Sequence, residues 1–461
     1  MYAELSFKVV KNKTLVAQFK VFIHRMKIYA PNASWILIEK ITNIGITFAI
    51  TILVARYLGP SQFGVLSYAT SLVALFAVAG HMGLSGLVVR DLVSSPKWVP
   101  QTMGTSFVLK MVGYLFGLLL IFIFALVTKD SKDGVFWILL ILAFALIFQP
   151  FNVIDFWFQS RLEAKFTAIA KTIALISISI TKIVYVFLGA HLIVFAVANT
   201  VQVILTSLIL LYFYHRRSQH SLKSWRFSSA RAKKLFSQGW MIFLGSIFAV
   251  IYLKVDQIMI KWLVSSEEVG IYAISARLSE AWYFVPSAIV ISLFPRLIKL
   301  RESDSLQFNK RLQQLFDLLF ICAIAVATFV TLAAQPLVNT LFGYEYSGAV
   351  PILIVHVWAA LFIFMRAAFS KWVLIENFLI FSLITHGFGA LVNLGLNFVL
   401  IPLYGGLGAA YATLISYAVS SYLALCLHSK SRPIFLMMTK SILFPFRFSI
   451  YLYRLKYEKN Y

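Results

Sequence analysis

The stretch that decides the fold is residues 104–127, which read GTSFVLKMVGYLFGLLLIFIFALV. Lys110 is its only charged residue. A helix needs about 20 largely apolar residues to cross the hydrocarbon core of a bilayer. The stretch therefore predicts one membrane-spanning helix, and the same criterion can be applied outward along the rest of the chain.

Twelve runs of the chain meet this criterion. Transmembrane β-strands would be about ten residues long with strict alternation of polar and apolar residues, whereas these runs are longer and continuously apolar. We therefore predict an all-α, polytopic membrane protein of about twelve transmembrane helices. The runs lie near 35–57, 63–89, 104–127, 135–158, 166–188, 192–214, 238–262, 269–293, 312–334, 349–374, 378–401 and 408–428.

The composition agrees with a membrane protein. Of the 461 residues, 61% are hydrophobic and 13% are charged, whereas soluble domains average about 45–50% apolar and about 25% charged residues. The net charge of +24 suits anionic lipid or an anionic substrate. Nucleic acid is not expected as a partner, because no stretch is polar enough to form a basic soluble domain. Cys322 and Cys426 lie apart in apolar runs, so we expect neither a disulfide framework nor a metal site.

The basic residues between the runs predict the orientation. If the N-terminus is cytoplasmic, all Lys and Arg outside the spans lie on the cytoplasmic side except Lys129 and Lys132. Cytoplasmic loops of membrane proteins carry such an excess of Lys and Arg. We therefore expect both termini in the cytoplasm.

The two halves of the chain resemble each other. The hairpin around Gly64 matches the one around Gly270, and each half then contains six spans. This pattern predicts two six-helix lobes related by a parallel pseudo-two-fold repeat, with an axis along the membrane normal. The predicted parts are a basic cytoplasmic arm (1–34), an N-terminal lobe (35–214), a basic cytoplasmic linker (215–237), a C-terminal lobe (238–428) and a basic cytoplasmic or interfacial tail (429–461).

Charged residues within the spans are the candidate site. Each costs roughly 2.5–3.5 kcal/mol at the centre of a spanning helix, so several should face a wet interior. Cations there suit an anionic group such as a diphosphate. The candidates for substrate binding are Lys110, Lys171, Lys182, Lys254, Arg277 and Arg366. Asp256 and Glu280 are candidates for binding a coupling proton or cation, although Arg277 and Glu280, three residues apart, could instead pair with each other.

Several motifs resemble those of a known family. Residues 55–60 read ARYLGP and are followed by Phe63 and Gly64; residues 157–163 read WFQSRLE; residues 401–410 read IPLYGGLGAA. In this order and spacing they resemble the Wzx-type polysaccharide flippases of the MATE-like MOP transporter superfamily. Ser160 stands where that family often has Gly.

The resemblance implies a V-shaped pair of lobes around a cationic cavity. It implies translocation of an undecaprenyl-pyrophosphate-linked oligosaccharide, such as an O-antigen repeat unit, across a bacterial inner membrane by alternating access. It further implies a lipid-linked oligosaccharide and membrane lipid as partners, with a polysaccharide polymerase and a chain-length regulator in the same membrane, and no cofactor.

Two other functions would leave different marks in the sequence. An ion-coupled multidrug or small-solute antiporter of the same superfamily would favour an acidic interior for organic cations, whereas these spans carry excess positive charge. A membrane enzyme such as a polymerase should have a large outer loop with catalytic residues. The longest predicted outer loop, 335–348, has Glu345 as its only charged residue and no His. We therefore expect a transporter, with no catalytic residues.

Overall fold

The computed structural model of the chain describes residues 2–128 and 134–444, without the side chains of 2–31, 33 and 295. The predicted outer loop with Lys129 and Lys132 and the end of the predicted tail lie outside the described residues. Within the described part, every regular element is a helix, which confirms the predicted all-α class.

The α-helices follow one another, most of them with short connections. Those of the first half are α1 (Tyr2–Ala77), α2 (Ser85–Ser94), α3 (Val99–Thr128), α4 (Val135–Phe144), α5 (Val153–Ser160), α6 (Ala164–Phe187) and α7 (Leu192–Arg217). Those of the second half are α8 (Ser229–Leu263), α9 (Ser266–Glu280), α10 (Phe284–Ser303), α11 (Ser305–Leu341), α12 (Ala349–His356), α13 (Ala360–Ile375), α14 (Leu379–Ser421) and α15 (Arg432–Ile442).

Two of the apolar helical stretches are too long for one span. Ser34–Ser94 has 61 residues and Leu379–Cys426 has 48, whereas 20 residues already cover about 30 Å. Each contains a glycine with positive φ, Gly59 (φ 69°) and Gly405 (φ 59°), at which the helical conformation is interrupted. The left-handed region costs glycine little because it has no Cβ.

The chain reverses direction at both glycines. Thr47 and Ala77, on either side of Gly59, line one cavity. Asn393 and Ser416, on either side of Gly405, are hydrogen-bonded at 3.5 Å. Of the described residues, eight helices are long and apolar enough to cross a membrane, and two bent helix pairs also qualify. With each kinked stretch counted as two spans, the total is the predicted twelve.

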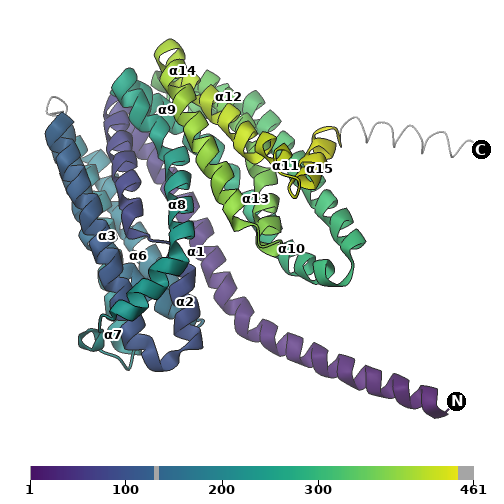
Figure 1. Cartoon of the computed structure of the whole chain (residues 1–461). Helices are drawn as coiled ribbons and strands as arrows, with labels where there is room; N and C mark the ends of the chain where they lie inside the picture. The colour runs from purple at the N-terminus through teal and green to yellow at the C-terminus, as the bar shows by residue number, and fades with distance from the viewer. Residues whose placement is uncertain (1, 129–133, 445–461) are drawn as a thin grey trace, which may run out of the picture.

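The helices form two lobes that meet at one end and diverge toward the other (Figure 1). Helices α3, α6 and α7 lie in one lobe, and α10, α11, α13 and α15 lie in the other. The largest buried apolar cluster contains residues of both halves, among them Leu72 and Ile274. This arrangement confirms the predicted pair of lobes.

Helix α8 contacts both lobes. Near its start, the Arg90 guanidinium of the N-terminal lobe donates to the Gln238 side chain at 2.5 Å. A Cβ atom on Gly83 would lie 2.6 Å from the carbonyl oxygen of Gly239, so the two backbones are in direct contact there. Further along, α8 packs on α14, where Tyr252 lies against Gly389. The start of the predicted C-terminal lobe is therefore packed on the N-terminal lobe.

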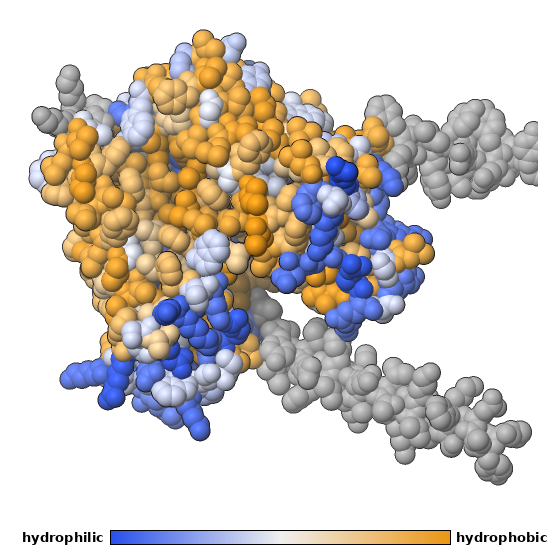
Figure 2. Space-filling model, viewed as in Figure 1, coloured by the Kyte–Doolittle hydropathy of each residue, from blue (hydrophilic) through white to orange (hydrophobic). Residues whose placement is uncertain are grey.

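The surface of the protein is divided into apolar flanks and polar ends. Apolar side chains cover the flanks of the helices, while polar side chains gather at the lower ends of both lobes (Figure 2). A broad apolar flank is the surface that lipid chains require.

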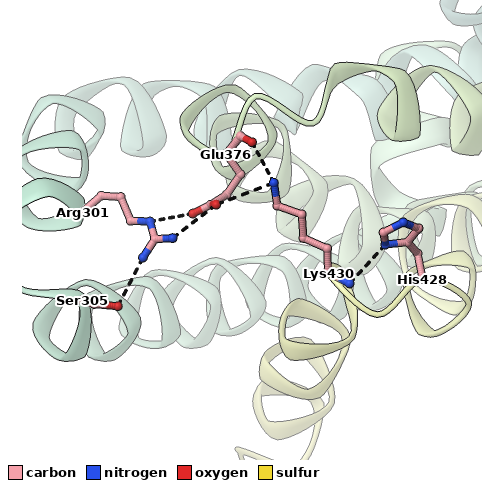
Figure 3. A network of polar contacts seen from close by, with 5 residues as sticks. All are labelled: Arg301, Ser305, Glu376, His428 and Lys430. Carbon is pink, nitrogen blue, oxygen red and sulfur yellow. Dashed lines mark hydrogen bonds and ion pairs between the residues drawn. The ribbon is translucent and has the colours of Figure 1, made fainter.

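A charged network holds three connections of the C-terminal lobe together (Figure 3). The Glu376 carboxylate, between α13 and α14, accepts from Arg301 Nε at 2.7 Å. Lys430, between α14 and α15, donates to the Glu376 carbonyl at 2.9 Å. Bidentate pairs of Arg with carboxylate fix geometry well, so this network sets the spacing of α10, α13 and α15 at their ends.

Candidate functional site

A cavity of about 490 Å³ lies against the inner face of the N-terminal lobe. Residues from α1, α6 and α7 form most of its wall, and Val250 of α8 and Arg277 of α9 close it from the C-terminal lobe. No carboxylate belongs to the described residues that line it. Its polar lining consists of Thr47, Thr51, Ser67, Thr70, His81, Gln149, Ser179, Lys182, Asn199, Thr200, Gln202 and Arg277.

Two predicted cations reach this cavity from opposite lobes. Lys182, on α6, donates to the Asn199 side chain of α7 at 2.7 Å. Arg277, on α9, crosses to the N-terminal lobe and donates to Thr51 Oγ1 at 2.7 Å. Its guanidinium also lies over the ring of Phe63, 5.7 Å from the centroid. Both cations therefore face neutral hydrogen-bond acceptors and remain available to an anion.

The pairing of Arg277 with Glu280 was the alternative left open by the sequence. Among the described residues, the two form no ion pair, and the hydrogen bond of Arg277 goes to Thr51 instead. Glu280 lines a separate, smaller cavity. The two residues lie on the same helix, but their side chains line different cavities.

Lys110 and Lys171 lie inside the N-terminal lobe and do not line the cavity. Lys110 is buried between aromatic rings, 5.2 Å from the centroid of Phe156 and 5.5 Å from that of Tyr114. Lys171 forms an ion pair with Asp155 at 3.2 Å. The structure thus gives both lysines partners in their own lobe.

Arg366 is buried in the C-terminal lobe, away from the cavity. It donates to the Ser420 carbonyl at 2.8 Å, to Thr385 Oγ1 at 3.3 Å and to His386 Nε2 at 3.2 Å. These bonds use three of the five N–H donors of the guanidinium and tie α13 to α14. Lys254 is half-buried on α8 and, within the described part of the chain, forms no hydrogen bond or ion pair.

Asp256 lies at the centre of a second polar cluster, in the C-terminal lobe. The side chain is buried, and its carboxylate accepts from Tyr272 at 2.5 Å, from Asn397 at 2.6 Å and from Thr413 at 2.8 Å. These donors come from α9 and from both halves of α14. The cluster therefore brings donors from three spans to one carboxylate on a fourth, α8.

A small cavity of about 10 Å³ lies beside this cluster and is lined by both Asp256 and Glu280. Two further lining groups, His356 Nδ1 and Tyr283 OH, are buried and lack a hydrogen-bond partner in the described structure. A space of this size holds one water molecule when polar groups surround it. The structure thus brings together the two acidic residues predicted for ion coupling.

Sequence reasoning missed the neutral partners that position these charges. Thr51 and Asn199 carry no charge and stand in apolar runs like many other polar residues. Asn397 and Tyr272, which donate to Asp256, are likewise uncharged residues within predicted spans. Charge draws attention to a residue, but its partner on another helix becomes visible only when the helices are packed together.

The fold is that of membrane transporters of the MOP superfamily. A lipid II flippase MurJ structure in an inward closed conformation matches with a TM-score of 0.68 at 15% identity, covering 92% of each chain. An inward-facing multidrug resistance transporter of the MATE family matches with a TM-score of 0.67 at 15% identity, covering 87% of this chain and 95% of that one.

The sequence then gives the family. Residues 30–301 match the family described as polysaccharide biosynthesis protein, and the chain belongs to this family. A Shigella flexneri protein named for O-antigen transport is 26% identical over 303 residues, which are 63% of this chain and 71% of that protein. A Haloferax volcanii protein named as the flippase AglR is 28% identical over 198 residues, which are 40% of this chain and 39% of that protein.

Proposed function

We propose that this protein is a flippase that moves an undecaprenyl-pyrophosphate-linked oligosaccharide, such as an O-antigen repeat unit, from the cytoplasmic to the outer leaflet of a bacterial inner membrane. The observation that carries the proposal is the cavity with Lys182 and Arg277 and without a carboxylate among its described lining residues. An organic cation would find no counter-charge there, whereas a diphosphate would find two.

Each part of the substrate has a suitable environment. The diphosphate is held by Lys182 from one lobe and Arg277 from the other, since ammonium and guanidinium groups bind phosphate oxygens. The hydroxyl and amide side chains of the same cavity, such as Thr70 and Gln202, suit sugar hydroxyls. The prenyl chain remains in lipid, because only apolar surface is offered by the flanks of the helices.

The lobes then rock about the axis of the repeat and expose the cavity to the outer leaflet. Asp256 and Glu280 take up the coupling proton or cation in the small cavity between them. Polymerase and chain-length regulator act next on the exported unit, in the same membrane and on its outer side. The relatives' names support the substrate class: one is named for O-antigen transport and another as a flippase.

The proposal is tested with purified protein in vesicles that contain a fluorescent polyprenyl-diphosphate oligosaccharide. Lys182→Gln and Arg277→Gln should each lower the rate at which the label becomes accessible on the far side by roughly tenfold, because a hydrogen bond to a charged group contributes about 1.5–3 kcal/mol. Lys182→Arg should retain most activity. Lys97→Gln, which removes an exposed charge outside the cavity, serves as the control.

One result of the vesicle assay would contradict the proposal. If the label never becomes accessible while a small cationic drug is transported by the same vesicles, the antiporter function replaces the flippase. In cells, deletion of the gene should leave lipid-linked repeat units on the cytoplasmic leaflet.

A further inference from the structure

The two lobes touch through a pair of glycines that the repeat makes equivalent. A Cβ atom on Gly64 would lie 1.7 Å from the carbonyl oxygen of Ser266 and 2.9 Å from the nitrogen of Gly270. A Cβ atom on Gly270 would lie 2.0 Å from the carbonyl oxygen of Pro60 and 3.1 Å from the nitrogen of Gly64. The contact is thus reciprocal, as in an isologous interface on a two-fold axis.

The atoms nearest to both Cβ positions are backbone atoms. A methyl group therefore could not be accommodated by a change of side-chain rotamer. Real Cβ atoms essentially never come within 3.0 Å of another heavy atom. A carbonyl oxygen stands where each side chain would begin, which is the geometry of Cα–H···O contacts between closely packed helices. Small residues allow such approach between spans, and here only glycine fits.

Further contacts between the lobes surround the glycine pair. Trp262 Nε1 donates to Tyr68 OH at 3.2 Å, and Ser71 donates to Gln257 at 2.8 Å. All four residues lie on α1 or α8 within two turns or so of the hairpins at the joined end of the lobes. The glycine pair is therefore part of a continuous seal on the side that we expect to face outward.

We propose that the contact between Gly64 and Gly270 is the closure of the outer side, which must part for the cavity to open outward. A methyl group at either position opposes closure and shifts the protein toward the outward-open state. The inference concerns conformation alone and does not depend on the identity of the substrate.

The test uses protein in which Cys322 and Cys426 are replaced by serine and one reporter cysteine is added. Ala273 is fully buried, three residues after Gly270 on the same helix face. In right-side-out vesicles, an impermeant maleimide should label Ala273→Cys slowly. Gly64→Ala or Gly270→Ala should raise this labelling rate by roughly tenfold, the size of a typical overpacking effect.

A second reporter examines the opposite side. Thr47 lines the cavity, and in inside-out vesicles labelling of Thr47→Cys should fall in the same two variants. Gly45→Ala is the matched control on α1, because nothing lies within 4 Å of its Cβ position. It should leave both rates at the parent value. Unchanged rates in a correctly assembled Gly64→Ala protein would overturn the proposal.

A third measurement keeps both glycines and therefore does not depend on whether the alanine variants assemble. Cysteines at Tyr68 and Trp262 are joined by a short bismaleimide before the reporter is labelled. Joining them should reduce labelling of Ala273→Cys from outside to background. Labelling at the unjoined rate would show that the reporter becomes exposed without separation of this contact, and the proposal would fail.

Discussion

Arg277 is positioned by residues of the opposite lobe. Its guanidinium donates to Thr51 on α1 and lies over Phe63 beyond the kink in the same helix. In a cavity that contains water, a flexible arginine adopts many conformations, and each fixed contact reduces the entropy lost when an anion binds. If Arg277 binds the substrate anion as we propose, Thr51 contributes to binding although its own side chain is neutral.

Replacing Thr51 with valine should weaken substrate binding without loss of the fold. Valine keeps the shape of threonine but cannot accept the hydrogen bond, so we expect a cost of about 1 kcal/mol, or roughly fivefold in affinity. Thr51→Ser keeps the hydroxyl and is the matched control. The half-saturating concentration in the vesicle assay measures the effect, and equal values for valine and serine would contradict it.

The sequence could identify which charged residues lie in spans, but not which of them share a cavity. Lys110, Lys171 and Lys182 look alike in sequence: all three are lysines in apolar runs, the first in 104–127 and the other two in 166–188. In the structure, rings surround the first, Asp155 pairs with the second, and only the third lines the cavity. The difference arises from helix rotation and from neighbours distant in sequence.

Among the helices, α14 shows how a hairpin of two spans is held. Gly405 has a positive φ of 59°, and the next backbone N–H, of Gly406, donates to the Glu268 carboxylate at 2.7 Å. Pro402 lies one turn earlier in the helix. The reversal thus combines a residue that tolerates the conformation with an acceptor for the freed N–H group.

Gly405→Ala should destabilise the protein by about 1–2 kcal/mol, because alanine is strained at positive φ and its Cβ would lie 2.7 Å from Glu268 Oε1. Gly395→Ala, in the same helix, is the control: its φ is not positive, and nothing lies within 4 Å of its Cβ position. Thermal unfolding in detergent distinguishes the two. A Gly405→Ala protein as stable as the control would disprove the strain.

Span number was predictable from sequence because the bilayer imposes a minimum length on every helix. The places where helices break were not all predictable. Gly59 is followed directly by Pro60, and Gly405 comes three residues after Pro402 and beside Gly406, so both turns are marked in the sequence. The start of α8, in contrast, gives no sign in its sequence that it packs on the other lobe. The pattern of apolar and polar side chains in the sequence describes each helix separately, whereas a contact between the lobes depends on how two helices pack together.

For the molecule as a whole, the separation of basic loops predicts a single orientation. Tyr344→Cys, at an exposed residue near the joined end of the lobes, should react with an impermeant maleimide in intact cells. Ser221→Cys, in the basic linker, should react only after the inner membrane is opened, because Lys-rich and Arg-rich loops stay in the cytoplasm. The reverse pattern would invert the orientation and with it the direction of transport.

Helix α8 cannot move as a rigid rod when the lobes rotate against each other. Its first turns are fixed to one lobe near Gly239, and its middle is fixed to the other at Tyr252. Any change of angle between these attachments has to appear as curvature of the helix. Gly245 lies between them, with only the tip of Leu383 within 4 Å of its Cβ position, so bending meets little resistance there. Bending α8 costs elastic energy, so the state in which α8 is straighter is favoured. The stiffness of this one helix thereby helps to determine to which side of the membrane the cavity opens when no substrate is bound.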